Sequence, residues 1–291
     1  MFMPELPEVE ITKKTLQKYV KNQYILGVEI NNYNLRYKID KNFCNNLRGR
    51  KINKITRRSK YLIFHLSDSN YFIIHLGMSG RIFISQKKNQ KLRLDTSFYS
   101  NSTPITKHNH VYFFFKKNIV IYNDVRRFGF IKYFKNKELE KSVHLKNLGI
   151  EPLSKDLTIS YIKKNIYRFD KSIKNILMDQ AFICGLGNIY VNEILYLSKV
   201  HPLRKSNSLN NLEIKSLYYY IKFVLKKSIQ LGGSTIRDFH NSEGKSGTFQ
   251  DTFKVYAKQG ERCIKKNCKG IVKKIVIGGR ASFFCSSCQK E

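Results

Sequence analysis

The sequence predicts an α+β protein in which strands form the N-terminal half, helices follow, and a small cysteine-rich hairpin ends the chain. Runs dense in Ile, Val, Phe and Tyr recur between residues 52 and 134, apolar residues recur with a helical period beyond residue 155, and four cysteines cluster near the C-terminus. The chain has 291 residues, more than one hydrophobic core usually serves, so two modules and a small third are expected.

The N-terminal half is expected to begin with one helix and to continue as antiparallel strands. The helix is expected from Pro7 to Val20, because proline and the acids Glu8 and Glu10 suit a first turn. Alternating apolar residues predict strands at 52–66, 71–85, 110–116 and 119–134. No helical pattern interrupts them, which favours antiparallel pairing in a sandwich or barrel.

The pattern becomes helical beyond a hinge that contains Gly149 and Pro152. Helices are expected at 156–168, 172–181, 188–199 and 210–230. The expected divisions of the chain are an N-terminal strand domain at 1–147, a linker at 148–154, a helical domain at 155–258 and a metal-binding finger at 259–291.

The cysteines near the C-terminus predict a structural zinc site. They form two pairs, spaced by four and by two residues: Cys263, Cys268, Cys285 and Cys288. Two such turns on a short hairpin supply four thiolates for a tetrahedral Zn²⁺, and intracellular chains rarely carry structural disulfides. The alternative is a reduced, metal-free tail, which would have too small a core to fold alone.

The charge of the chain favours a polyanionic partner. Lys and Arg number 54 against 21 Asp and Glu, a formal net charge of +33, which suits nucleic acid. Coding bias toward A+T would also enrich Lys, so the charge supports this partner without proving it. The apolar runs are too short for a membrane span and the N-terminus has no secretory pattern, so a soluble, cytoplasmic protein is expected.

The opening Pro4-Glu5 is the strongest candidate for chemistry. A proline at a mature N-terminus offers a secondary amine that can attack an electrophilic sugar carbon and form an iminium, and Glu5 could shuttle protons. The alternative is a plain helix start. Glu5 and the positive end of the helix would shift the amine's pKa in opposite directions.

Three further motifs have both a functional and a structural interpretation. Met78, Arg126 and Phe128 lie in Gly-containing bends and either wedge into stacked bases or pack in the core. Lys60, with Arg58, forms either a phosphate track or a solvated strand face. Gly185-Leu186-Gly187-Asn188 either binds phosphate at a helix start, with Lys174 nearby, or is an ordinary turn in which Asn188 caps the helix.

Together these residues resemble the bacterial formamidopyrimidine-DNA glycosylase family, over nearly the whole chain and in order. The matching motifs are Pro-Glu-Leu-Pro-Glu-Val-Glu at 4–10, Arg-Arg-Ser-Lys-Tyr-Leu at 57–62, the segment 75–81, Lys-His-Asn-His at 107–110, the segment 124–129, Leu-Gly-Ile-Glu-Pro-Leu at 148–153, Gly-Leu-Gly-Asn-Ile-Tyr at 185–190, His-Pro-Leu-Arg at 201–204, Gly-Gly-Ser-Thr-Ile-Arg-Asp-Phe at 232–239 and the cysteine tail.

The resemblance implies a β-sandwich with an N-terminal helix, a helix–two-turn–helix module with a zinc-finger hairpin, and double-stranded damaged DNA as partner of a cytoplasmic, nucleoid-associated monomer. It implies flipping of an oxidised purine, excision through a proline Schiff base, and β,δ-elimination. The catalytic set implied is Pro4, Glu5, Lys60 and Arg280, the last two at phosphates. The DNA-binding set expected is His75, Met78, Arg126, Phe128, Lys174, Asn188, Tyr256 and Lys274. A loop at about 233–249 would cover the extruded base.

The chain also departs from the family pattern. Met1-Phe2-Met3 precedes Pro4, and an acylated Pro4 nitrogen cannot form an iminium, so we expect translation to start at Met3 and Met3 to be removed. Val125 replaces a usual proline, Asn109 a usual aspartate and Thr248 a common aromatic. The alternatives are an endonuclease VIII-like pyrimidine enzyme, against which Leu6 argues, and a non-catalytic zinc-dependent DNA-binding protein if Pro4 stays blocked.

Overall fold

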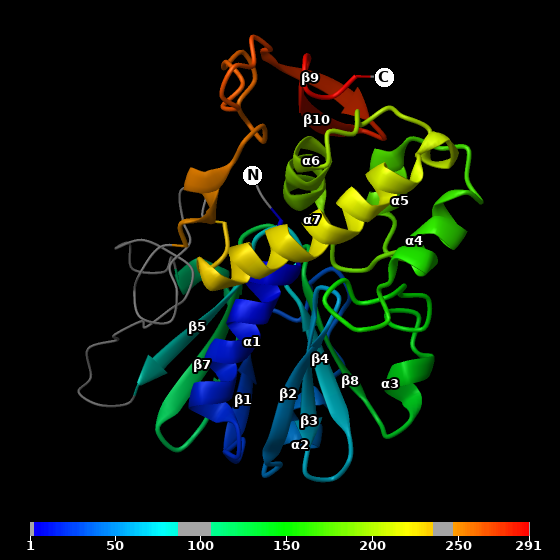
Figure 1. The fold of residues 1–291 in the computed structure, drawn as a ribbon. Helices are drawn as coiled ribbons and strands as arrows, with labels where there is room; N and C mark the ends of the chain where they lie inside the picture. Colours follow the sequence, from blue (N-terminus) through cyan, green and yellow to red (C-terminus); the bar gives the residue numbers. More distant parts are fainter. Residues whose placement is uncertain (1–2, 87–105, 235–246, 291) are drawn as a thin grey trace. The chain divides into compact units, whose positions relative to one another are not determined.

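The computed structural model describes residues 3–86, 106–234 and 247–290 (Figure 1). The chain forms two compact units, and it passes from one to the other more than once. The sheet unit comprises residues 1–146 and 229–250, and the helical unit comprises residues 147–228 and 251–291. None of the helices in the described ranges combines the length and the apolar character needed to cross a membrane.

The sheet unit contains α1 (Leu6–Val20) and two four-stranded antiparallel sheets. One sheet has the order β1-β6-β7-β5, with the bounds Gly27–Ile30, Asn109–Phe114, Asn118–Asp124 and Gly80–Gln86. The other has the order β2-β3-β4-β8, with the bounds Ile52–Arg58, Tyr61–Leu66, Tyr71–His75 and Phe130–Phe134. Short helices α2 (Phe43–Leu47) and α3 (Glu138–Lys141) and a 3₁₀ turn (Thr106–His108) complete the unit. The antiparallel fold class expected from the alternation is confirmed.

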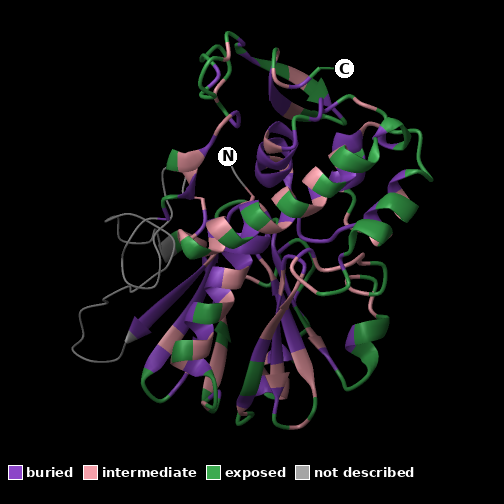
Figure 2. Cartoon of the chain, viewed as in Figure 1, coloured by how far each residue is buried: buried purple, intermediate pink, exposed green. Residues whose placement is uncertain are grey.

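The core of the sheet unit is built from aromatic and aliphatic side chains of both sheets and of α1 (Figure 2). Phe72 stacks on Phe64 at 4.1 Å between ring centroids and on Phe113 at 5.6 Å. From α1, Leu16 and Val20 are fully buried in the same cluster. Each such side chain contributes on the order of 2 kcal/mol by leaving water, which fixes α1 on the sheets.

The helical unit contains four main helices and a two-stranded hairpin. The helices are α4 (Ile159–Ile166), α5 (Ile173–Met178), α6 (Asn188–Leu197) and α7 (Asn211–Gln230), and the strands are β9 (Val272–Ile277) and β10 (Arg280–Cys285). Thr158 and Ser172 cap α4 and α5 by accepting backbone N–H bonds. Gly278 and Gly279 both have positive φ, which permits the two-residue turn of the hairpin.

The structure divides three of the strands expected from sequence. The expected strand 52–66 becomes β2 and β3 of one sheet, and the other two divisions have functional consequences. The expected strand 71–85 becomes β4 and β5, and 119–134 becomes β7 and β8, whose members lie in different sheets. The glycine-containing segments 76–79 and 125–129 carry the chain across from one sheet to the other. The two segments that carry Met78, Arg126 and Phe128 are therefore sheet-to-sheet crossovers, which apolar periodicity alone does not distinguish from continuous strands.

Candidate active site

The start of α1 holds the candidate nucleophile and acid. Glu5 is the N-cap residue and only 2% exposed, and Pro4 before it is half-buried. The Glu5 carboxylate accepts the N–H of Glu8, while the Glu5 N–H donates to Glu8 Oε2 at 3.0 Å. This reciprocal capping fixes the backbone beside Pro4 at the positive end of the helix.

Glu8 also joins α1 to a second segment of the sheet unit. Its Oε1 atom accepts bonds from the N–H and the hydroxyl of Ser234, each at 2.9 Å. Ser234 is the last described residue before the segment 235–246. Most of the expected base-covering loop, and Met1 and Phe2, thus lie outside the described residues, while exposed Thr248 donates its N–H to Leu231 O at 3.0 Å.

Lys60 lies in the tight turn between β2 and β3. Its side chain is only 6% exposed, so the interpretation of Lys60 as part of a solvated strand face is wrong. Arg57 supports the turn by donating to Ser59 O at 2.8 Å and to Glu10 Oε2 of α1 at 2.9 Å. The turn that carries Lys60 is therefore tied to α1, the helix that follows Pro4 and Glu5.

His75, at the end of β4, is held as a neutral hydrogen-bond donor. Its Nδ1 accepts the N–H of Gly77 at 3.1 Å, so the ring proton lies on Nε2. Burial between aromatic rings, and then the positive charges of Lys60, Arg36 and His144, lower the pKa of His75 to about 3. A neutral imidazole can donate one N–H to an anion without a prior proton uptake.

A buried carboxylate, Asp124, joins the two crossovers. Its Oδ1 accepts the hydroxyl of Ser79 and the N–H of Arg126, the latter at 3.3 Å. Its Oδ2 accepts the hydroxyl of Tyr122 at 3.1 Å and the N–H of Gly129 at 2.8 Å. Asp124 has no exposed surface, so these donors replace water around a buried charge. The motif match included Asp124, but its role was not predicted, because its partners lie up to 45 residues away.

Two glycines let the crossovers approach each other. A Cβ on Gly77 would lie 2.4 Å from the backbone of Gly129, and Gly77 has a φ of +61°. A Cβ on Gly129 would lie 2.1 Å from the hydroxyl of Tyr122. Any larger residue at either position would push the two loops apart.

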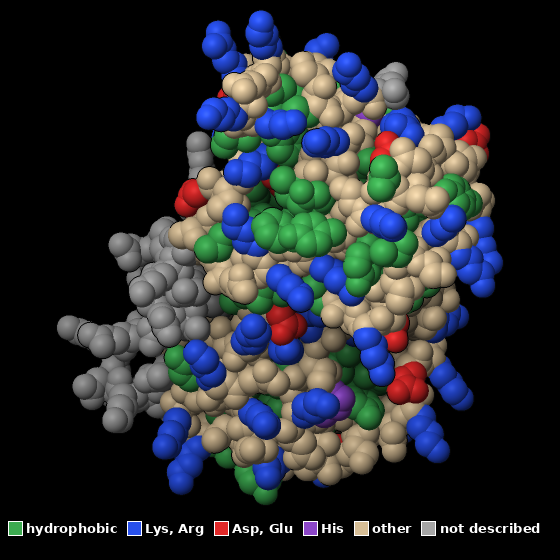
Figure 3. Space-filling model, viewed as in Figure 1, with side chains coloured by type: hydrophobic (Ala, Val, Ile, Leu, Met, Phe, Trp, Pro, Cys, Tyr) green, Lys and Arg blue, Asp and Glu red, His purple; other side chains and the backbone are tan. Residues whose placement is uncertain are grey.

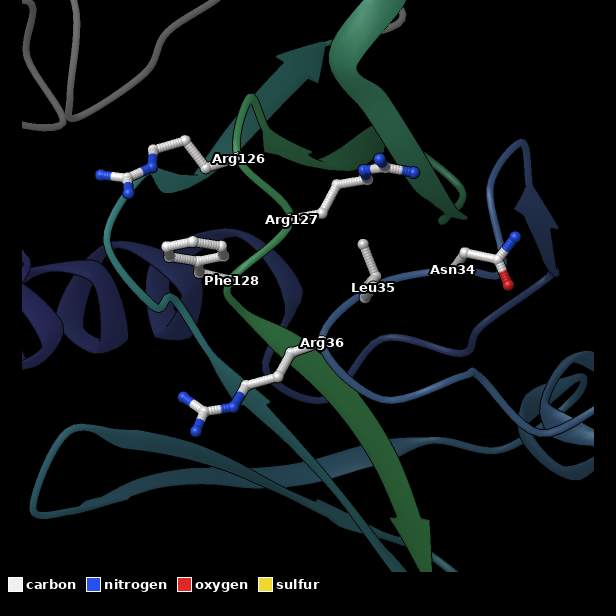
Figure 4. Close-up of a pocket in the computed structure, with 6 residues that line it drawn as sticks. All are labelled: Asn34, Leu35, Arg36, Arg126, Arg127 and Phe128. Carbon is white, nitrogen blue, oxygen red and sulfur yellow. The ribbon is translucent and has the colours of Figure 1, made fainter.

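The three wedge candidates lie on these crossovers. Phe128 is 43% exposed, so the core-packing interpretation is wrong for it, and Met78 is half-buried. The Arg126 guanidinium lies over the Phe128 ring at 4.5 Å from its centroid (Figure 4). Figure 3 shows Lys and Arg side chains spread over the visible face, with few Asp and Glu side chains among them.

In the helical unit, two expected phosphate ligands donate hydrogen bonds to the hairpin. Lys174 is 1% exposed and donates to Ala281 O at 3.0 Å and to the Ser282 hydroxyl, and Asn188 donates to Ala281 O at 3.0 Å. Asn188 is the first residue of α6 and Gly187 is the N-cap, so the expectation that Asn188 caps this helix is wrong. These contacts hold the strand that begins at Arg280.

A second buried carboxylate, Glu193 of α6, orients Tyr256. It accepts the N–H groups of Lys254, Val255 and Tyr256 at 2.9, 3.0 and 2.9 Å. Burial raises the pKa of Glu193, and the three N–H bonds oppose that shift. The ring of Tyr256 also packs against Phe283 at 5.2 Å. The positioning role of Glu193 was not predicted from the sequence.

The four cysteines of the hairpin converge on one point. Their sulfur atoms all lie within 4.8 Å of one another, with Cys268 Sγ 3.4 Å from Cys288 Sγ and 3.7 Å from Cys285 Sγ. A tetrahedral ion with bonds of about 2.3 Å requires edges of about 3.8 Å, so the donor set fits a metal ion. Tyr196 of α6 adds a hydroxyl 3.2 Å from Cys263 Sγ. The expected four-cysteine metal site is therefore confirmed in its geometry.

Fold and site together define a two-unit α+β protein whose C-terminal hairpin has a four-cysteine cluster with the geometry of a metal site. Two family models match it: the formamidopyrimidine-DNA glycosylase N-terminal domain at residues 3–131 and the formamidopyrimidine-DNA glycosylase H2TH domain at residues 148–240. The chain belongs to the formamidopyrimidine-DNA glycosylase family.

Full-length relatives and solved structures agree with this assignment. A formamidopyrimidine-DNA glycosylase of Rickettsia bellii is 39% identical and one of Roseobacter denitrificans 35%, each over 99% of this chain and 100% of the relative. The Lactococcus lactis Fpg, solved in complex with DNA containing an abasic site, is 33% identical with a TM-score of 0.86, over 99% of this chain and 100% of that one. A mutant of the Lactococcus lactis protein, solved in complex with DNA containing Fapy-dG, gives the same values.

Proposed function

We propose that this protein excises oxidised purines, 8-oxoguanine and formamidopyrimidines, from duplex DNA in the cytoplasm and then cleaves the strand at the abasic site. Membership of the family supports the glycosylase activity, and relatives solved with abasic and Fapy-dG DNA support the substrate class. The observation that carries the proposal is Pro4-Glu5 at the start of α1, with Glu5 buried and fixed by Glu8.

The proposed reaction begins with the ring nitrogen of Pro4. Its lone pair attacks C1′ of the flipped nucleotide while the glycosidic C–N bond breaks and the base leaves with that electron pair. Ring opening then gives an iminium between Pro4 and C1′. The iminium acidifies the protons on C2′, so β-elimination breaks the bond from C3′ to its phosphate oxygen, and δ-elimination breaks the one from C5′.

Glu5 is proposed to move the protons of these steps. Its carboxylate lies next to Pro4 in the chain, and the N–H of Glu8 holds it in place. It would protonate the departing group or the opened sugar oxygen and later accept a proton. Substitution of Glu5 by Gln keeps the shape and removes this capacity, so base excision should be lost while DNA is still bound.

A reactive Pro4 requires a free nitrogen, so we propose that the functional chain starts at Pro4. Translation from Met3 and removal of Met3 would give this end. The match to the N-terminal family model begins at Met3, which supports that start. If Met1 were the start, Phe2 and Met3 would leave Pro4 in a peptide bond.

The remaining site residues are proposed to bind DNA. Lys60 and neutral His75 would hold phosphates beside the lesion, and Arg280 another from the hairpin. Met78, Arg126 and Phe128 would fill the space left by the flipped nucleotide, with Arg126 on the orphaned cytosine.

A structural zinc ion is proposed for the four cysteines. When bound, it would fix the hairpin that presents Arg280 and Lys274, and it would take no part in the reaction. Tyr196 would support the site by donating its hydroxyl to Cys263 Sγ. Lys174 and Asn188 would support DNA binding indirectly, because both donate hydrogen bonds to Ala281 O and so hold the same hairpin in place.

Borohydride trapping on an 8-oxoguanine:cytosine duplex tests the proposal. A chain that starts at Pro4 should give a covalent protein–DNA adduct and release 8-oxoguanine. A Met3→Leu variant, which can only start at Met1, should bind the duplex without forming an adduct. Glu5→Gln should lose base excision. Efficient excision by the Met3→Leu protein with Pro4 still acylated would refute the mechanism, and preferential release of thymine glycol would favour the endonuclease VIII-like alternative.

A further inference from the structure

A pocket of about 620 Å³ lies beside the Phe128 loop, within the sheet unit. Asn34, Leu35 and Arg36 line one side of it, and residues 126–128 line the other (Figure 4). Its volume is in the range of pockets that hold small ligands or nucleotide units. None of the proposed site residues explains the side formed by residues 34–36.

The pocket is strongly cationic. Three of its six lining residues are arginines and none is acidic. Within the described part of the chain, neither Arg36 nor Arg127 forms an ion pair, and both side chains are exposed. Arg36 lies 5.8 Å from the ring of Tyr37, and its charge also helps to lower the pKa of His75. Such a pocket attracts an anion.

The backbone holds Arg36 in a defined relation to Phe128. The N–H of Arg36 donates to Gly129 O at 3.1 Å, which ties residues 34–36 to the crossover fixed by Asp124. In Figure 4, Arg126 and Arg36 lie on either side of the Phe128 ring and extend in the same direction. Arg127, which has a φ of +56°, extends the other way.

We propose that this pocket receives one sugar-phosphate unit of the DNA strand opposite the lesion, with Arg36 as the ligand of its phosphate. The inference rests on the proposed function, which directs Arg126 and Phe128 toward the orphaned cytosine. A guanidinium on the far side of Phe128 from Arg126 then faces the backbone of that same strand. Arginine pairs with phosphate through two parallel N–H bonds, which suits an exposed side chain on a fixed backbone.

The salt dependence of binding provides the first test. Affinity for a non-cleavable abasic-analogue duplex opposite cytosine is measured between 50 and 200 mM salt for the parent, Arg36→Gln and Arg48→Gln. Loss of one phosphate contact should lower the slope of log K against log salt by about 0.9 in Arg36→Gln. Arg48, an exposed arginine of the same unit outside the pocket, is the matched control and should leave the slope unchanged.

Neutral methylphosphonates locate the contact. One is placed at each of several successive positions of the strand opposite the lesion. The parent should lose about tenfold in affinity at one position, and Arg36→Gln, already about tenfold weaker, should lose nothing further at that position. Arg36→Lys should recover the salt slope but only part of the affinity, because it keeps the charge without the paired N–H bonds.

The outcomes separate this inference from the function on which it rests. A parent protein that neither binds nor excises in lesion duplexes overturns the proposed function and the pocket assignment with it. A fully active parent whose Arg36→Gln variant shows the same slope overturns the pocket assignment alone. So does an Arg36→Gln variant that still loses tenfold at every position where the parent does.

Discussion

The two units position their proposed DNA-contacting loops by different means. In the sheet unit, the crossovers are held by the chain's own groups: the Asp124 carboxylate accepts four hydrogen bonds, and Gly77 and Gly129 allow the loops to meet. In the helical unit, the hairpin that presents Arg280 has a small core and four convergent thiols. The first arrangement is complete within the polypeptide, whereas the second has the geometry to hold the proposed zinc ion.

Both units nevertheless share one feature, a buried carboxylate that accepts hydrogen bonds from a segment distant in sequence. Asp124 accepts a hydrogen bond from the hydroxyl of Ser79, which lies 45 residues away in sequence. Glu193 accepts one from the N–H of Tyr256, which lies 63 residues away. A buried carboxylate is stable only when it is fully hydrogen-bonded, so each one specifies a single loop conformation. Loops that must meet a ligand in one geometry benefit from this constraint.

The largest expected effect is the loss of the hairpin in Cys285→Ser. Removal of one of four ligands should release the metal and unfold the hairpin, because structural zinc commonly contributes about 10 kcal/mol or more to such a module. DNA binding should fall sharply, while the sheet unit keeps its thermal transition. Mass spectrometry measures the metal content, and circular dichroism measures the unfolding of the hairpin and the thermal transition of the sheet unit. Cys44→Ser, which removes a thiol outside the cluster, should keep the metal.

Asp124→Ala should cost the sheet unit about 4 kcal/mol of unfolding free energy. It leaves the hydroxyls of Ser79 and Tyr122 and the N–H of Gly129 without their acceptor, at about 1–3 kcal/mol for each donor that stays buried. Urea denaturation measures the change. Asp40→Ala removes an exposed carboxylate of the same unit and should cost less than about 1 kcal/mol. Equal losses of unfolding free energy in the two variants would show that Asp124 does not hold the two crossovers together.

Glu193→Gln should have a smaller effect, about 2 kcal/mol, confined to the helical unit. The amide keeps one acceptor oxygen but turns an NH₂ group toward a backbone N–H, so one donor near Tyr256 loses its partner. Urea denaturation measures the loss of unfolding free energy, and the NMR amide resonances of residues 254–256 show which N–H group loses its acceptor. Glu261→Gln, on an exposed pair with Lys258, is the control and should change neither.

The smallest expected effect is a pH dependence carried by His75. Its folded pKa of about 3 lies below the ordinary value of 6.5, so the unfolded chain takes up this proton first as the pH falls through 6.5. Stability is therefore lost on acidification, by up to about 1.4 kcal/mol at pH 5.5. His75→Gln should remove that part of the loss, as urea titrations at pH 7.5 and 5.5 would show. An identical pH dependence in both proteins would mean that His75 is not held neutral.

The sequence was sufficient where the signal was local or compositional. The cysteine spacing predicted the convergence of the four thiols, and apolar periodicity predicted α4 to α7 close to their observed bounds. The crossovers could not be predicted, because a strand that changes sheets keeps the apolar pattern of one that continues. The roles of Asp124 and Glu193 and the burial of Lys174 depend on partners 45 to 108 residues away, and no local pattern encodes such pairs. Arg36 was missed for the same reason.

The most direct test of the central claim is peptide mapping of the borohydride-trapped complex by mass spectrometry. The account predicts that the reduced sugar is bonded to the nitrogen of a peptide that begins Pro4-Glu5-Leu6, with residues 1–3 absent. A peptide that retains Met1-Phe2-Met3 and carries the adduct on a lysine, from a sample that excises 8-oxoguanine, would contradict it.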